Sequence, residues 1–89
     1  MGFNTVTVTT SATLIVGANT QRQSLIIDNT SAQDLYIGPD DSVTTANGTR
    51  IVKGGNLTET NDGTRPYMGP YYGIVGATTS DIRYWERLR

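Results

Sequence analysis

Residues 23–38 constrain the fold most, because they place two apolar runs, residues 25–27 and 35–37, on either side of a polar stretch of turn-forming residues. Short runs of this kind, bounded by Asn, Asp, Ser and Gly, are typical of β-strands. We therefore expect the segment to form a β-hairpin. It holds the densest apolar clustering in the chain, so we place it at the centre of a β-sheet core.

Residues 3–10 alternate between valine and threonine, with Val6 and Val8 on one face of an extended chain and the threonines on the other. This period of two predicts a half-buried strand at a sheet edge or a subunit contact. An ordinary sheet strand is the simpler interpretation. The alternative is that residues 1–10 form an arm that pairs with a neighbouring subunit.

Further strands are predicted at residues 12–16 and 56–60, and the Gly54-Gly55 pair should interrupt the chain between strands. Residues 39–42 form a turn, because proline fixes φ at a value that turns favour. Asn47-Gly48 predicts a type I′ hairpin that pairs residues 43–46 with 49–52. Because residues 43–46 are only weakly apolar, a looser loop is the alternative.

The C-terminal part predicts a last hairpin, in which residues 71–75 pair with 81–86 across a turn near residues 77–80. In its second strand, Ile82 and Tyr84 share one face and Arg83 shares the other with Trp85. Residues 61–70 form the longest irregular segment, a type of loop that often carries function.

No segment shows a sustained helical period, and fifteen threonines with many Gly, Asn and Asp residues favour short strands and tight turns. We predict an all-β fold: a small antiparallel β-sandwich or barrel of about seven to eight short strands, without significant helix. The 89 residues form a single domain, residues 1–89.

The chain is lean in apolar residues, at 36%, and contains no cysteine that could reinforce the core. A domain of this size buries only about 60–65% of the surface that its unfolded chain exposes. Small chains without disulfides often gain stability by association. We therefore expect a homo-oligomer or a subunit docked on a partner.

The scattered charges sum to −1, which gives no electrostatic footprint for nucleic acid, and no apolar run is long enough to span a membrane. The N-terminus lacks the features of a signal peptide. The chain has no histidine and no cysteine, so the commonest general base, nucleophile and metal ligands are missing. We predict that the protein is not an enzyme and uses no cofactor or metal; loop carboxylates such as Asp40 and Asp62 are better explained by turns.

Aromatic residues concentrate near the C-terminus, and adjacent strand positions face opposite sides of a sheet. Tyr71 and Tyr72 therefore cannot both be core residues, nor can Tyr84 and Trp85. The outward members predict a protein contact in preference to a sugar-stacking site. The candidate interface residues are Val6, Val8, Tyr67, Tyr71, Tyr72, Tyr84 and Trp85.

Several segments together resemble small β-sandwich structural proteins encoded among the virion genes of tailed bacteriophages. The resemblance spans residues 13–86 and is carried by residues 24–31 (SLIIDNTS), 34–38 (DLYIG), 43–48 (VTTANG), 54–55 (GG) and 71–86 (YYGIVGATTSDIRYWE). It implies a structural part of the particle, made in the host cytoplasm and released within the virion, and it carries over no site residues.

The leading functional expectation is therefore a capsid decoration subunit that binds the major capsid protein or another virion protein, with a trimer as the favoured oligomer. A glycan- or host-surface-binding module displayed on the virion is the alternative from a different class. A tail or adaptor component is the third possibility, which sequence alone does not separate from the first.

Overall fold

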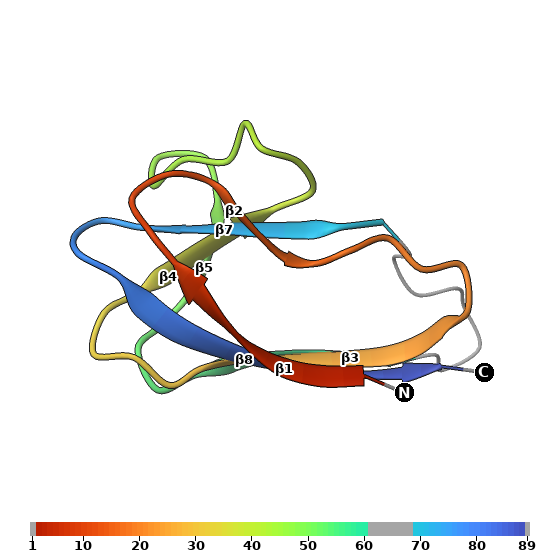
Figure 1. Cartoon of the computed structure of the whole chain (residues 1–89). Coiled ribbons are helices and arrows are strands. Elements are labelled where there is room, and N and C mark those ends of the chain that lie inside the picture. The colour runs from red at the N-terminus through yellow and green to blue at the C-terminus, as the bar shows by residue number, and fades with distance from the viewer. Residues whose placement is uncertain (1, 61–68, 89) are drawn as a thin grey trace.

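The structure, a computed structural model, describes residues 2–60 and 69–88, and folds them into antiparallel strands that form two sheets without a helix in these ranges (Figure 1). The predicted all-β sandwich is thus confirmed. The strands are β1 (Gly2–Val8), β2 (Thr13–Val16), β3 (Arg22–Asn29), β4 (Leu35–Gly38), β5 (Thr49–Ile51), β6 (Asn56–Thr60), β7 (Tyr71–Val75) and β8 (Ser80–Leu88).

The first sheet has the strand order β1-β8-β3-β6 and the second has the order β2-β7-β4-β5. The pairs are nested along the chain, since β1 pairs with β8, β2 with β7, β3 with β6 and β4 with β5. These nested pairs form one long antiparallel hairpin, which folds over on itself so that β3 also pairs with β8 and β4 with β7. This is the strand order of an eight-stranded jelly roll.

The predicted hairpin at residues 23–38 is wrong. β3 and β4 do form there, each as an inner strand, but they belong to different sheets. The segment between them crosses from one sheet to the other, held by the Asn29 side chain, which accepts hydrogen bonds from the backbone N–H and the hydroxyl of Ser31. The turn-forming residues were recognised correctly, but they build an arch instead of a hairpin.

The predicted hairpin at residues 71–86 is wrong for the same reason, because β7 and β8 also lie in opposite sheets. The hairpin at Asn47-Gly48 is wrong as well: β5 pairs with β4, and Val43 lies in a loop. Among the described residues only Thr78 and Gly54 have positive φ, so no type I′ turn forms at Asn47. The Asn47 side chain instead accepts a hydrogen bond from the backbone N–H of Thr44 at 2.7 Å.

Other local predictions agree with the structure, while most of the predicted irregular segment 61–70 lies outside the described residues. β1 is an edge strand, β2 and β6 occupy the expected positions, and the Gly54-Gly55 pair separates β5 from β6. Asp40 organises the turn after β4 by accepting hydrogen bonds from the backbone N–H and the hydroxyl of Ser42. These features depend on local chemistry alone, which explains why a sequence pattern can predict them.

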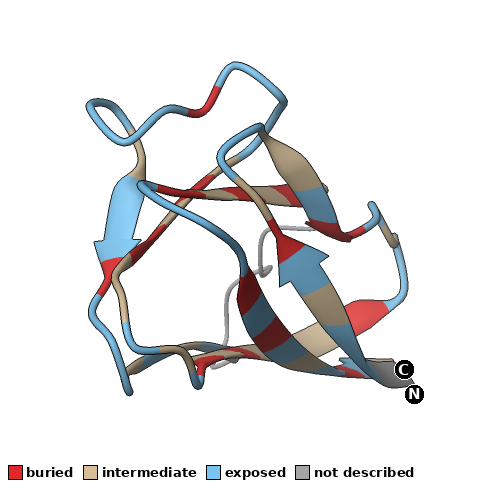
Figure 2. Ribbon diagram, turned by 60° about the vertical axis from the view of Figure 1, so that its left-hand side comes forward, coloured by how far each residue is buried: buried red, intermediate tan, exposed pale blue. Residues whose placement is uncertain are grey.

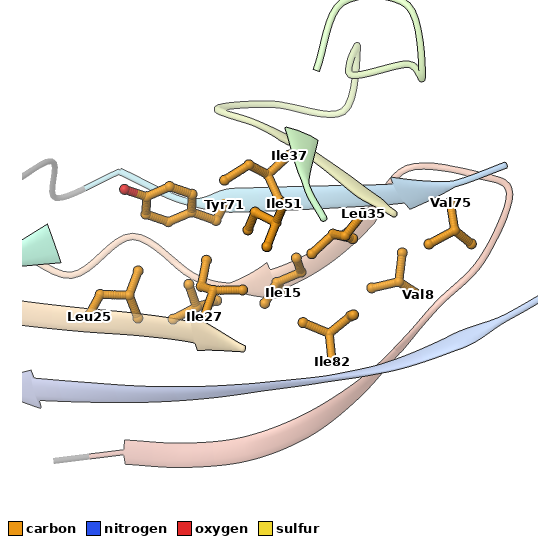
Figure 3. Packing of buried hydrophobic residues seen from close by; sticks show 11 residues of the cluster. Val8, Ile15, Leu25, Ile27, Leu35, Ile37, Ile51, Tyr71, Val75 and Ile82 are labelled. Atoms are coloured by element: carbon orange, nitrogen blue, oxygen red, sulfur yellow. The ribbon is translucent and has the colours of Figure 1, made fainter. Parts of the chain in front are cut away.

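The core lies between the sheets, and buried residues alternate with half-buried ones along β7 and most of β3, and with exposed ones at the start of β8 (Figure 2). Side chains from both sheets point into one layer, as Figure 3 shows for most of its members. At Gly73 an added Cβ would lie 2.6 Å from Ile15 Cδ1, so the absence of a side chain there lets Ile15 pack across β7. The buried cluster consists of Val8, Ile15, Val16, Leu25, Ile27, Leu35, Ile37, Ile51, Tyr71, Val75 and Ile82.

A buried arginine ties the sheets together where β3 begins. Arg22 is fully buried, and its Nε donates to the Glu86 carboxylate at 2.7 Å. Its terminal nitrogens donate to the carbonyl oxygens of Gly69 at 2.9 Å and Gly17 at 2.7 Å, and its guanidinium lies over the Tyr71 ring. One side chain thus joins β8 of the first sheet to segments that flank β2 and β7 of the second.

A buried asparagine also ties the two sheets together, at the point where β3 ends. The Asn29 amide nitrogen lies 2.9 Å from the carbonyl oxygen of Gln33, 3.0 Å from that of Ile51 and 3.2 Å from that of Val52. The Asn29 backbone also exchanges hydrogen bonds with residues 54–55. Because buried polar groups must be paired, these bonds fix where β3 and β5 lie relative to each other.

Candidate interaction surface

The predicted interface residues do not form one surface. Val8 and Tyr71 are buried in the core of the chain itself, and Val6 and Tyr84 pack against that core. Tyr72 is half-buried on the outer side of the second sheet, and Tyr67 lies outside the described residues. Trp85 is 51% exposed and is therefore the candidate that can contact a partner directly.

Trp85 lies on the outer face of the first sheet, on β8, directly opposite Ile26 of β3 in the register. Both strands are inner strands, so this pair occupies the middle of the face. Asp28 and Arg83 form the next cross-strand pair. We call Ile26, Asp28, Arg83 and Trp85 the Trp85 face; with Tyr84 they line a shallow depression of about 390 Å³.

The Trp85 face combines an apolar centre with charged and polar neighbours. A second depression of about 190 Å³ continues past Trp85 toward Ser24 and Arg87. On the other side, Arg83 aligns with Thr5 of β1. A half-exposed tryptophan surrounded by polar groups is the composition that protein interfaces favour at their energetically important positions.

The outer face of the second sheet carries a smaller apolar patch. Leu14 is 46% exposed and lies opposite Tyr72, while Tyr36 lies opposite Ile74. The loop after β4 covers part of this face, since a Cβ added at Gly48 would lie 2.7 Å from Tyr36 Cβ. The chain therefore fills part of this face itself, whereas Trp85 stays open.

The described residues hold no group of three or more His, Cys, Asp or Glu side chains that could bind a metal ion. Every buried side-chain nitrogen and oxygen in the described ranges has a hydrogen-bond partner. No helix able to cross a membrane occurs in residues 2–60 and 69–88. On the Trp85 face, Trp85 offers a ring for stacking and an apolar surface for burial, and Asp28 and Arg83 offer hydrogen bonds and charge.

No family model, no curated protein and no solved structure gives a significant match to this chain.

The sequence analysis placed Arg83 on the same strand face as Trp85, but it missed Ile26 and Asp28 as surface residues. It also missed Arg22 and Asn29 as the buried links between the sheets. One signal was available for Ile26. In a strand, the middle residue of an apolar run of three must face away from its two neighbours. Ile26 therefore had to lie on the outer face if its neighbours fill the core.

Proposed function

We propose that this protein is a structural subunit that acts by docking on other proteins, as a bacteriophage virion component that decorates the capsid surface. The observation that carries the docking function is the half-exposed Trp85, opposite Ile26 in the middle of a sheet face. Exposed tryptophan with apolar neighbours is costly to leave in water and is enriched at binding hot spots.

The virion location is supported by the sequence resemblance and by the fold. Jelly rolls are recurrent in viral capsid domains, although they also occur in lectins and cupins. This second support is an analogy at the level of the fold, so it raises the expectation without assigning a role to any residue. The Trp85 face supplies the residues through which a capsid contact would act.

Two experiments test the proposal. Mass spectrometry of purified phage particles should detect the chain, and its absence from intact virions would refute the virion location. Trp85→Ser should abolish binding to particles that lack the chain. Leu14→Ser is the matched control, because Leu14 is similarly exposed but lies on the opposite sheet. Equal binding by both variants would refute docking through the Trp85 face.

A second candidate function has its own supporting observation. Asp28 and Arg83 line the same depression as Trp85, which places hydrogen-bonding charged groups beside an aromatic ring. Such an arrangement suits a sugar ring that stacks on the indole while its hydroxyls bond to the charged groups. A glycan array would distinguish the two functions: sugar binding that Asp28→Ala abolishes favours the glycan module, whereas no binding to any sugar removes it.

A further inference from the structure

The four sheet edges of this protein are not equally protected. Edge strands expose unpaired N–H and C=O groups, and folded proteins shield them with short length, charge, proline or bulges. β5 has three residues and includes Arg50, and β6 has five and includes Glu59. β2 has four residues, and its register shifts between Leu14 and Val16. Each of these three edges thus carries a protective feature.

β1 has none of these features. It is seven residues long and contains no charged residue and no proline. Its pairing with β8 runs in continuous register from Gly2 opposite Glu86 to Val8 opposite Ser80. Among the described residues no strand is hydrogen-bonded to its other side, because β1 is the border of its sheet (Figure 1). Directly after β1, the Thr9 carbonyl oxygen accepts a hydrogen bond from the backbone N–H of Val75 in β7 at 3.1 Å, so the open part of the edge ends there. A long, uncharged and regular edge is a template for another strand.

The structure also shows which backbone groups face outward. The Thr5 N–H donates to the side-chain oxygen of Asn4 at 2.8 Å. Thr5 is therefore one of the residues whose backbone points away from β8. In an antiparallel pair such residues alternate with those that bond to the neighbouring strand. Phe3 and Thr7 share this orientation, so the outward set of β1 is symmetric about Thr5.

We propose that β1 pairs antiparallel with β1 of a second copy of this chain, about a two-fold axis at Thr5. Thr5 then lies opposite Thr5 of the other copy, and Phe3 lies opposite Thr7. Every outward residue of one copy meets an outward residue of the other, which gives roughly six backbone hydrogen bonds. In the single chain the Asn4 side chain accepts the hydrogen bond of the Thr5 N–H, which is the central donor of the edge. On pairing, the Thr5 carbonyl oxygen of the other copy would replace it.

The charges around β1 are compatible with this self-pairing. The central pair is threonine against threonine, which is favourable across strands. Arg83 is the charged residue that aligns with Thr5. In the dimer the two Arg83 positions would lie three strand spacings apart, about 14 Å. That distance exceeds the Debye length of about 8–10 Å near physiological salt, so their repulsion is largely screened.

The dimer would contain one continuous eight-stranded sheet. Because the two-fold axis is perpendicular to that sheet, both Trp85 faces lie on the same side of it. A target with repeated sites would then be bound by two faces at once, which raises the effective affinity without any new contact. The pairing itself does not depend on what the Trp85 face binds, so its test is separate from that of the proposed function.

Sedimentation velocity or light scattering across a concentration series tests the pairing. The wild-type chain should form a dimer, and Thr5→Pro should raise the dissociation constant about 100-fold or more, since it removes two N–H groups from the interface and adds two rings. Because the Thr5 N–H is not donated to β8, the variant should keep its fold. Thr5→Val retains the N–H and a β-branched side chain, and should dimerise like the wild type.

A measurement on the wild-type chain covers the case in which Thr5→Pro does not fold. Amide exchange at Thr5 and Thr7 should be slow at high protein concentration and fast after dilution. Exchange in β5, an edge strand of the other sheet that takes no part in the pairing, should not depend on concentration. The pairing would be overturned by a monomer at every concentration or by amide exchange at Thr5 that does not change with concentration. A trimer, the state expected from the sequence, would also overturn it.

Discussion

Asn29→Ala should destabilise the protein more than its small change in volume indicates. The Asn29 side chain is fully buried and connects the end of β3 to the end of β5 and to the arch that follows. In the alanine variant the carbonyl oxygen of the buried residue Ile51 would lose its contact with the amide nitrogen. Ser31 would lose the amide oxygen that accepts its two hydrogen bonds. No side chain in the variant would replace either partner.

The expected loss follows from two contributions. A net intramolecular hydrogen bond contributes about 1 kcal/mol, and at least two are lost, while a buried acceptor left unpaired costs about 1–3 kcal/mol more. The sum is about 3–5 kcal/mol. A chain of this length has a free energy of unfolding of roughly 4–13 kcal/mol. With an unfolding entropy of about 2.1 cal/mol/K per residue, the midpoint of thermal unfolding should therefore fall by about 16–27 °C.

Urea unfolding followed by far-ultraviolet circular dichroism measures this loss, and an unchanged slope with a lower midpoint would show that stability alone has changed. Asn56→Ala is the matched control, because Asn56 is exposed on β6 and, among the described residues, its side chain accepts a single 3.4 Å hydrogen bond, from Thr58. It should change the free energy of unfolding by less than about 0.5 kcal/mol. If Asn29→Ala costs no more than this control, the buried amide does not hold the sheets together.

Three further predictions concern the other polar and aromatic features. Arg22→Met should destabilise the fold by about 3–5 kcal/mol in urea unfolding, since it leaves the Glu86 carboxylate buried without its partner; a loss below about 1 kcal/mol would contradict a structural role for the pair. Hydrogen bonds from Ser42 hold the pKa of Asp40 below its ordinary value of 3.8, so their contribution to stability is complete above that value and is lost as the pH falls through the lowered pKa. An NMR titration should show the Asp40 pKa rising toward 3.8 in Ser42→Ala, and an unchanged pKa would exclude the hydroxyl as a cause. Trp85→Ser should leave the thermal midpoint within a few degrees of the wild type, because half of the side chain is already in water; a collapse of the fold would assign Trp85 to the core.

Apart from residues 43–46, the sequence predicted where strands form, but it did not predict how they pair. Alternation at residues 3–10 and 82–85 depends on the pleat of a single strand, so it is visible without the rest of the chain. Pairing depends on distant partners: β3 is flanked by β6 and β8, and no turn signal in residues 28–34 distinguishes an arch from a hairpin.

The residues of the candidate site were likewise predictable where a single strand determines their position, but not where strand pairing does. The sequence predicted that either Tyr84 or Trp85 must point outward, and the structure shows that Trp85 is the outward one. Asp28 and Ile26 reach the Trp85 face through the pairing of β3 with β8, which the sequence did not predict. Asn47-Gly48 was misinterpreted because Val43 packs against Gly38 and does not form a strand.

The position of β8 has a consequence for synthesis. β8 is the last strand of the domain to leave the ribosome, yet it lies between β1 and β3 and supplies the partner for both. Until it emerges, β3 can pair with β6 but the first sheet cannot be completed, and the apolar sides of β1 and β3 remain open to other nascent chains. The domain should therefore fold only after translation of its final residues, and a product truncated before Ser80 should be insoluble.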